Sequence, residues 1–318
     1  MLMKPSLFSM FISLAVLSIP FNILSPAASA GKFLERLLES RRDNQNQWSS
    51  SSDNFKLLRN ISYGDDPAHR MDVYLPPDPA SFKTAKAPVI FMVHGGGWKR
   101  GDKSSRRVAV NKVVRWVPKG FIFISANNRL RPVADPIQQA DDIALALAKA
   151  QKSAASWGAD PDRFLLMGHS AGAHLIALLN ADPDRALNMG ARPWLGAVSL
   201  DSGAMNVPEI MEKRHARLYD QAFGDDPGFW KAASPFHALT TKAKPFLLVC
   251  SAKRRAACAQ TDLFAARAES FAVPVQVLKQ PLSHGEINEQ LGLDGEYTEA
   301  VEKFISGLDP VLNRLLAP

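Results

Sequence analysis

The chain has 318 residues, of which 46% are hydrophobic and 22% are charged, proportions typical of a globular protein with a sizeable core. Its formal net charge is +7 at pH 7. Because the Lys and Arg residues are scattered and form no basic stripe interleaved with aromatic residues, we expect a basic solvated surface and no nucleic-acid partner.

The first thirty residues have the pattern of a secretory signal. Lys4 supplies a short positive region, Leu7–Leu24 is almost wholly apolar, and an Ala-Ser-Ala triplet ends at Ala30. This order predicts a signal peptide over residues 1–30, cleaved after Ala30, and hence export to the periplasm or the medium. A retained anchor is the alternative, because the apolar run is about long enough to span a bilayer. Pro20 interrupts the run and favours cleavage, so we expect no stable membrane insertion after the signal is removed.

Residues 31–54 form a predicted leader and linker. Apolar residues at helical spacing in Phe33–Leu38 indicate a short amphipathic helix, and Gln45–Asp53 is polar and Ser-rich, as flexible linkers are. The globular domain is therefore expected over residues 55–318.

Beyond residue 55, short apolar runs alternate with helical patterns. Eight runs are predicted to be strands: Leu58–Tyr63, Arg70–Leu75, Pro88–Val93, Phe121–Ala126, Arg163–Met167, Leu195–Leu200, Pro245–Cys250 and Val273–Leu278. Helical patterns fall at Val108–Val117, Ile137–Ala150, Ala171–Leu179, Leu263–Phe271 and Tyr297–Leu308. The turn signal Asp65-Asp66-Pro67 makes the first two strands antiparallel, whereas helical crossovers make the later strands parallel. The prediction is an α/β domain whose eight-stranded, mostly parallel sheet is covered by helices on both faces.

A glycine-rich turn, His94-Gly95-Gly96-Gly97-Trp98, directly follows the third predicted strand. Consecutive glycines lack the Cβ atoms that would obstruct their backbone N–H groups, so Gly96 and Gly97 are candidate donors to a developing oxyanion. A phosphate-binding loop is disfavoured, because no Lys-Ser or Lys-Thr pair follows the glycines. A turn without a chemical role is the other alternative.

The segment Gly168-His169-Ser170-Ala171-Gly172 follows the fifth predicted strand and opens a helical pattern. A serine between two glycines at such a junction sits on a sharp turn that exposes Oγ at the carboxyl edge of the sheet. The helix directs free N–H groups at the same place, which makes the amide of Ala171 a third candidate oxyanion donor. Ser170 is therefore predicted to be a nucleophile rather than a helix-capping serine.

The stretch between the sixth and seventh predicted strands is too long for a simple connection. Residues 203–240 carry the large aromatic side chains Phe223, Phe229, Trp230 and Phe236, among others. Because an insertion of this length in a compact domain is usually functional, we predict a short cap over the active site.

A general base is needed to activate Ser170, and the chain has seven histidines. In chains with this elbow the order is serine, acid, histidine, with the histidine on a loop after the last strand. His284 fits this place, because it follows Val273–Leu278. His169 and His174 flank the nucleophile on the elbow and its helix, where they cannot approach Oγ correctly.

The acid partner of the histidine is ambiguous in the sequence. Its usual place is the loop after the seventh strand, but this loop has no carboxylate and carries the basic run Lys253–Arg255. Asp201, directly after the sixth predicted strand, is the preferred candidate because it projects from the same edge of the sheet. Asp262, in the first turn of the next helix, and a triad without a carboxylate are the alternatives. The basic run is expected to leave unpaired positive charges near His284.

The chain has two cysteines, Cys250 and Cys258. In an exported protein, an oxidising compartment permits a disulfide between them. Two free thiols are the alternative, because spacing alone does not fix the Cα geometry that a disulfide requires.

Together these motifs resemble the α/β-hydrolase family of carboxylesterases, in the branch that shares a His-Gly-Gly-X-Trp loop with kynurenine formamidases and bacterial esterases of feruloyl-esterase type. The likeness covers roughly Ile61 to Ile305 and includes Asp72-Val73-Tyr74-Leu75-Pro76. It implies the α/β-hydrolase fold with these roles: nucleophile Ser170, base His284, and oxyanion donors Gly96, Gly97 and Ala171. The family's acid after the seventh strand has no match in this chain.

The predicted function is hydrolysis of a small-molecule carboxylic ester through an acyl-enzyme. An N-formyl amide hydrolase of the kynurenine formamidase type would use the same residues, although export argues against it. A non-catalytic binding protein that kept the fold after losing its acid is a further alternative. No metal or cofactor is implied, because no Cys/His cluster has ligand spacing and a serine triad needs none. The sequence leaves the oligomeric state open.

Overall fold

The computed structural model describes residues 55–77 and 86–317. The predicted signal peptide over residues 1–30 and the leader over residues 31–54 lie outside the described residues, and both stay predictions.

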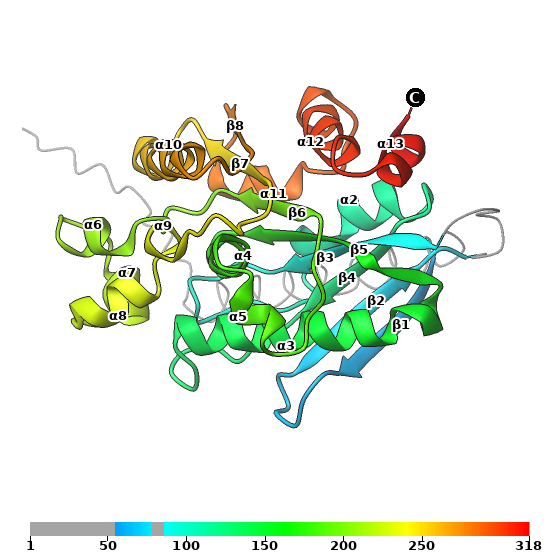
Figure 1. The fold of residues 1–318 in the computed structure, drawn as a ribbon, viewed down its shortest axis with the longest axis horizontal. Helices are drawn as coiled ribbons and strands as arrows, with labels where there is room; N and C mark the ends of the chain where they lie inside the picture. Colours follow the sequence, from blue (N-terminus) through cyan, green and yellow to red (C-terminus); the bar gives the residue numbers. More distant parts are fainter. Residues whose placement is uncertain (1–54, 78–85, 318) are drawn as a thin grey trace, which may run out of the picture. The chain divides into compact units, whose positions relative to one another are not determined.

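Eight strands form one sheet in the order β1-β2-β4-β3-β5-β6-β7-β8 (Figure 1). Their bounds are β1 Lys56–Ser62, β2 Arg70–Leu75, β3 Ala87–Val93, β4 Ile122–Ala126, β5 Ala159–His169, β6 Gly196–Leu200, β7 Phe246–Ser251 and β8 Val275–Gln280. β1 pairs with β2 and β2 with β4 in antiparallel fashion, and the other neighbouring strands are parallel. The mostly parallel eight-stranded sheet predicted from the sequence is confirmed.

Helices connect the strands and cover the sheet. Outside the cap they are α2 Arg106–Trp116, α3 Pro136–Ser153, η3 Ala154–Trp157, α4 Ala171–Ala181, α5 Asp184–Leu187, α10 Arg255–Ser270, α11 His284–Glu289, α12 Glu296–Ser306 and α13 Pro310–Leu316. Figure 1 shows α2, α12 and α13 on one side of the central strands and α3 and α5 on the other. Both faces of the sheet are therefore covered, as the continuous apolar strands require.

The helix after β7 differs from the prediction. It was expected over Leu263–Phe271, but α10 begins at Arg255. Its first two turns bury Ala257, Cys258 and Thr261. These small residues give a weak apolar signal at helical spacing, and Cys and Thr have low helix propensity. Because α10 starts eight residues earlier than predicted, the basic run Lys253–Arg255 lies at the start of this helix, next to the site described below.

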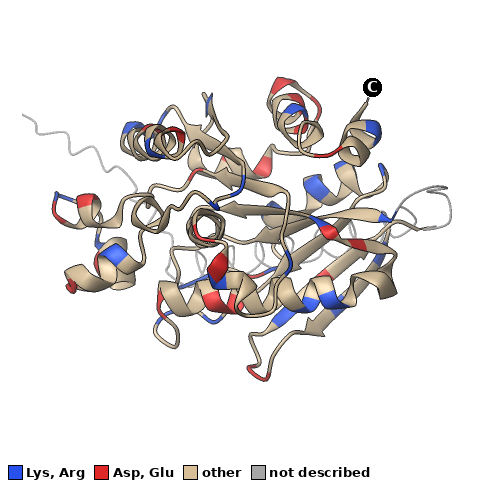
Figure 2. Cartoon of the chain, viewed as in Figure 1, with Lys and Arg blue, Asp and Glu red and all other residues tan. Residues whose placement is uncertain are grey.

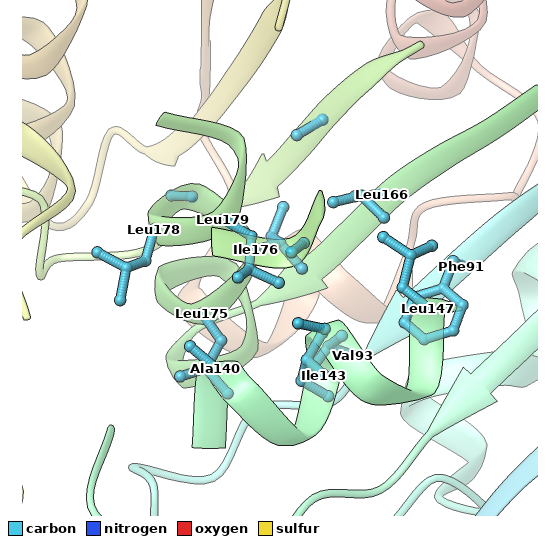
Figure 3. Close-up of a cluster of buried hydrophobic side chains, with 14 of the residues drawn as sticks. Phe91, Val93, Ala140, Ile143, Leu147, Leu166, Leu175, Ile176, Leu178 and Leu179 are labelled. Carbon is cyan, nitrogen blue, oxygen red and sulfur yellow. The ribbon is translucent and has the colours of Figure 1, made fainter. Parts of the chain in front are cut away.

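One hydrophobic cluster fixes the central strands to α3 and α4 (Figure 3). Its side chains come from four elements: Phe91 and Val93 of β3, Leu166 of β5, Ala140, Ile143 and Leu147 of α3, and Leu175, Ile176, Leu178 and Leu179 of α4. The α3 residues recur at the spacing of one helical face, and Asp135 and Gln138 form a capping box at its start. Every residue of α4 is buried, so the turn that precedes α4 rests on a closely packed base.

The predicted insertion folds as four short helices between β6 and β7: α6 Val207–Met211, α7 Arg217–Phe223, α8 Pro227–Ala232 and α9 Pro235–Ala238. A buried histidine fastens this cap to the domain. The indole Nε1 of Trp98 donates to Nδ1 of His174 at 3.2 Å, so the His174 Nε2–H donates to the carbonyl oxygen of Ala233 at 2.7 Å. Burial lowers the pKa of His174 to about 4, and the neutral ring suits this donor–acceptor arrangement. Phe223 packs edge-on to Trp98 at 4.9 Å between ring centroids.

The charged residues are spread over the described chain. Figure 2 shows Lys and Arg interspersed with Asp and Glu along the helices. Within residues 55–77 and 86–317, no helix is both long and apolar enough to cross a bilayer.

Candidate active site

Ser170 occupies the sharp turn between β5 and α4. Its backbone has φ 56° and ψ −118°, a left-handed conformation that costs a non-glycine residue of order 1–3 kcal/mol. A Cβ on Gly168 would lie against the backbone of Gly172, and a Cβ on Gly172 would lie against the carbonyl oxygens of Val93 and His94. Only glycine fits on either side of the serine, which explains the spacing seen in the sequence.

A chain of short contacts joins Ser170 to His284 and Asp201. His284 Nε2 lies 3.0 Å from Ser170 Oγ, and His284 Nδ1 lies 2.7 Å from Asp201 Oδ2. The carboxylate can only accept, so Nδ1–H donates to it and leaves Nε2 free to accept the serine proton. The structure thus brings the three residues together in the order and orientation that the sequence hypothesis requires.

His284 is held by the start of α11. Ser283 and Glu286 form a capping box around the first turn. Beneath the ring, the His169 Nε2–H donates to the carbonyl oxygen of His284 at 2.8 Å, and the two rings lie 4.5 Å apart between centroids. Burial and the neighbouring His284 lower the pKa of His169 to about 3, so His169 is a neutral donor. The sequence identified His169 as a neighbour of the nucleophile but missed this support.

Asp201 is buried at the end of β6. Its backbone N–H donates to the carbonyl oxygen of Val249 at 2.8 Å, and its Oδ1 accepts from the amide of Ser251 at 3.0 Å. Burial by itself would raise the pKa of Asp201, but hydrogen bonds from His284, Ser251 and Arg254 outweigh it and hold the pKa below its ordinary value. The carboxylate is therefore ionised at neutral pH.

Two cations of the basic run after β7, Lys253 and Arg254, are paired with carboxylates, which corrects the expectation that they stand unpaired near His284. Arg254 Nη1 donates to Asp201 Oδ2 at 2.6 Å and lies 2.8 Å from His284 Nδ1. Because Nδ1 already directs its hydrogen at Asp201, the second contact is a close approach of two donors that share one carboxylate oxygen. Lys253 lies 3.7 Å from Glu286. Arg254 lies in the loop where the family usually has its acid, and it donates a hydrogen bond to Asp201, the acid that this chain has instead.

The alternative acid, Asp262, lies elsewhere. It sits on α10 and forms an ion pair with Lys279 of β8 at 2.8 Å. Both side chains are about half exposed. Asp262 has no contact with His284 among the described residues.

The glycine loop presents its backbone beside the nucleophile. Gly96 has φ +136°, and a Cβ there would collide with the carbonyl of Arg100; Gly97 has φ +61°. Within the described residues no group accepts a hydrogen bond from the amides of Gly96, Gly97 or Ala171, and all three residues line the same cavity as Ser170. The amides are thus available to a ligand, as an oxyanion hole requires.

His94 forms a hydrogen bond to the backbone of the glycine loop. Its ring is buried, and Nδ1–H donates to the carbonyl oxygen of Gly95 at 2.9 Å. Burial lowers the pKa of His94, which keeps the ring neutral. The neutral ring thus holds the backbone of the glycine loop at Gly95.

A cavity of about 800 Å³ opens above Ser170. Its walls combine the glycine loop, the first turns of α2 and α11, and the cap residues Leu218 and Tyr219 of α7. The inserted helices therefore border the nucleophile. Among the described residues, no group of three or more His, Cys, Asp or Glu side chains is arranged to hold a metal ion.

Cys250 and Cys258 form a disulfide with their Cα atoms 5.3 Å apart. It joins the end of β7 to the first turns of α10 and so encloses the loop that carries Arg254. Of the two alternatives left by the sequence, the structure contains the bridge.

The chain is similar in sequence to known proteins. A family model described as BD-FAE matches residues 71–266. Esterase LipQ of Mycobacterium tuberculosis is 32% identical over 230 residues, which are 67% of this chain and 53% of that protein. Esterase LipC of the same organism is 28% identical over 204 residues, which are 60% of this chain and 49% of that protein. The chain thus spans about half the length of these curated relatives.

Solved structures share the fold at lower identity. Esterase B of Lactobacillus rhamnosis superposes with a TM-score of 0.62 at 18% identity, covering 91% of this chain and 96% of that chain. That similarity shows the α/β-hydrolase fold expected from the motifs.

Proposed function

The chain belongs to the BD-FAE family of α/β-hydrolase esterases, and on this premise we propose that it is a serine esterase that cleaves small-molecule carboxylic esters through an acyl-enzyme. The observation that carries the proposal is the hydrogen-bonded chain Ser170–His284–Asp201 beside the available amides of the glycine loop.

The geometry supports the following steps. His284 Nε2 takes the proton of Ser170 Oγ while the oxygen attacks the ester carbonyl carbon. The carbonyl oxygen becomes an oxyanion and accepts from the amides of Gly96, Gly97 and Ala171, each worth about 2.7–4 kcal/mol of transition-state stabilisation. Asp201 stabilises the imidazolium and keeps its Nδ1–H directed away from the serine.

The acyl-enzyme then forms and is hydrolysed. His284 gives its proton to the departing alkoxide oxygen, the carbon–oxygen bond breaks, and the alcohol leaves. Water enters, loses a proton to His284 and attacks the acyl carbon; the proton returns to Ser170 Oγ as the carboxylic acid leaves. Ester and water are consumed, and the alcohol and the carboxylic acid account for all of their atoms.

The alternative of a non-catalytic binding protein rested on a missing acid, and the position of Asp201 removes that basis. The N-formyl amide alternative uses the same residues, so an N-formyl anilide belongs in the substrate panel as a comparison with p-nitrophenyl esters.

The test is Ser170→Ala. We expect this variant to fold like the wild type and to lose p-nitrophenyl ester turnover by several orders of magnitude, because the nucleophile is absent while both elbow glycines remain. A fluorophosphonate probe should label the wild type at Ser170 and leave the variant unlabelled. Hydrolysis at the wild-type rate by the variant would refute the proposal.

We also propose that the protein is exported after removal of residues 1–30. The disulfide between Cys250 and Cys258 supports this proposal, since disulfides persist in oxidising compartments. Intact-mass measurement of protein from the native host should give a chain that begins at Gly31 and contains no alkylatable thiol. A chain that retains residues 1–30 would contradict the export proposal and leave the esterase proposal standing.

A further inference from the structure

A second cavity, of about 660 Å³, adjoins the one above Ser170. The two cavities share the lining residues Gly203, Leu218, Tyr219 and Arg254. The second cavity lies between the start of α10 and the cap helices α6 and α7, and Ile210 and Ala257 give it apolar wall. The two cavities therefore adjoin at these four residues, next to Tyr219.

The charges around the two cavities are unbalanced. Each carboxylate in their walls already has a basic partner: Asp201 with Arg254 at 2.6 Å, Glu289 with Arg107 at 3.1 Å, and Glu209 with Lys213 at 2.6 Å. Four further cations in the walls are exposed and have no carboxylate partner among the described residues: Lys99, Arg100, Arg214 and Arg255. Arg214 and Arg255 both line the second cavity.

The backbone adds positive potential at the same place. α10 is a 16-residue helix that begins at Arg255 and has no acidic residue in its first turn. Its residues Arg255, Ala256 and Ala257 line the second cavity, so the positive end of the helix dipole borders that space. Arg255 at this helix start and Arg214 between α6 and α7 line the same cavity, and guanidinium groups are well suited to bind a carboxylate or another oxyanion.

We propose that the substrate is an ester that carries a second, ionised acidic group, and that Arg214 and Arg255 bind this group in the second cavity. This inference rests on the proposed esterase function and adds the substrate class. The apolar wall suits the carbon chain between the ester and the anion, while the guanidinium groups select the charge. Electrostatic attraction at an exposed site contributes mainly to ground-state binding, so the effect belongs in KM rather than in kcat.

Two matched substrate pairs test the proposal on either side of the ester. On the acyl side, p-nitrophenyl monoadipate is compared with p-nitrophenyl hexanoate, which has the same chain length and no charge. On the alcohol side, 3-(4-acetoxyphenyl)propanoate is compared with its primary amide. For the wild type, we expect a lower KM for the charged member of at least one pair, and a KM that rises with ionic strength for that member alone.

The double variant Arg214→Ala/Arg255→Ala removes the two unpaired charges that line the second cavity. For the preferred charged ester we expect kcat/KM to fall by roughly threefold to tenfold, the range that two exposed ion pairs provide. The neutral partner should change by less than about twofold on the same scale. Arg314→Ala is the matched control, because Arg314 on α13 is exposed and lines neither cavity. Arg214→Lys/Arg255→Lys should retain most of the preference.

The outcomes separate this inference from the proposed function. Equal losses for charged and neutral esters, or no preference for either charged ester in the wild type, would overturn the inference while neutral ester turnover still supports an esterase. A wild type that hydrolyses none of the four esters and resists the fluorophosphonate probe would overturn the esterase function itself.

Discussion

The strand ends that carry Ser170 and Asp201 are enclosed by neighbouring strands and helices, whereas the cap is assembled from short helices with many exposed side chains. Asp201 is fully buried, but Leu218 of the cap is 43% exposed, and α8 buries none of its residues. The residues whose mutual distances must be precise, Ser170 and Asp201, thus lie on the closely packed strand ends. We expect selection among substrates to depend on the more exposed cap, where side chains can change without disturbing the sheet.

The largest effect is expected from a substitution of Asp201, the acid at the closely packed strand ends. Asp201→Asn should lower turnover by about 10⁴, because an amide favours the wrong imidazole tautomer and cannot stabilise the imidazolium. Turnover of a neutral p-nitrophenyl ester measures the loss. Asp262→Asn is the control and should be nearly silent, since Asp262 pairs with Lys279. A silent Asp201→Asn would instead mean that Ser170 and His284 work as a dyad.

A smaller effect comes from the buried support beneath His284. Lys112 of α2 is fully buried, and its Nζ donates to the backbone and side-chain oxygens of Asn288 on α11 at 2.6 and 2.9 Å. Burial lowers the pKa of Lys112 to about 7 from 10.5. Between these two values the unfolded chain binds a proton that the native chain does not, so the free energy of unfolding should rise with pH by up to about 1.4 kcal/mol per unit.

Lys112→Met removes this titration. The difference in unfolding free energy between the wild type and Lys112→Met, measured by urea denaturation, should grow in favour of the wild type by roughly 1.5–2 kcal/mol from pH 7 to 8.5. Lys303→Met on α12 is a control, because Lys303 is exposed. A difference that stays constant with pH would show that Lys112 is not neutralised in the native protein.

The smallest of the three effects is expected from Arg254, which lies between the strand ends and the cap. Arg254 clamps Asp201 and also lines both cavities, but its side chain is 36% exposed, so water can replace part of the lost contact. Arg254→Met should lower kcat for a neutral ester by about tenfold and leave KM little changed, since loss of a charge-assisted hydrogen bond is worth about 1.5–3 kcal/mol before such replacement. Arg254→Lys should recover part of kcat. A rise in KM with unchanged kcat would make Arg254 a substrate contact rather than a positioning residue.

The sequence by itself determined the sheet, the elbow and the glycine loop. Apolar runs, helical spacing and paired glycines are local patterns that depend on chain sterics and burial, so they can be recognised without knowing what lies nearby. They were sufficient to single out Ser170, Gly96, Gly97 and Ala171, and together with the chain order expected after such an elbow they pointed to His284.

Only the tertiary structure decided which carboxylate faces His284. The sequence favoured Asp201, directly after a strand, over Asp262, in the following helix, but residue type and chain position alone left both candidates open. What separates them is that β6 and β7 are adjacent in the sheet, which brings Asp201 beside Ser251 and Arg254. Other features also depend on elements that are distant in the chain. They are the pairing of Arg254, the charged second cavity, and the contact of Lys112 with Asn288 across 176 positions. Charge pairing is set by distance in space, which becomes fixed only when separate elements pack against one another.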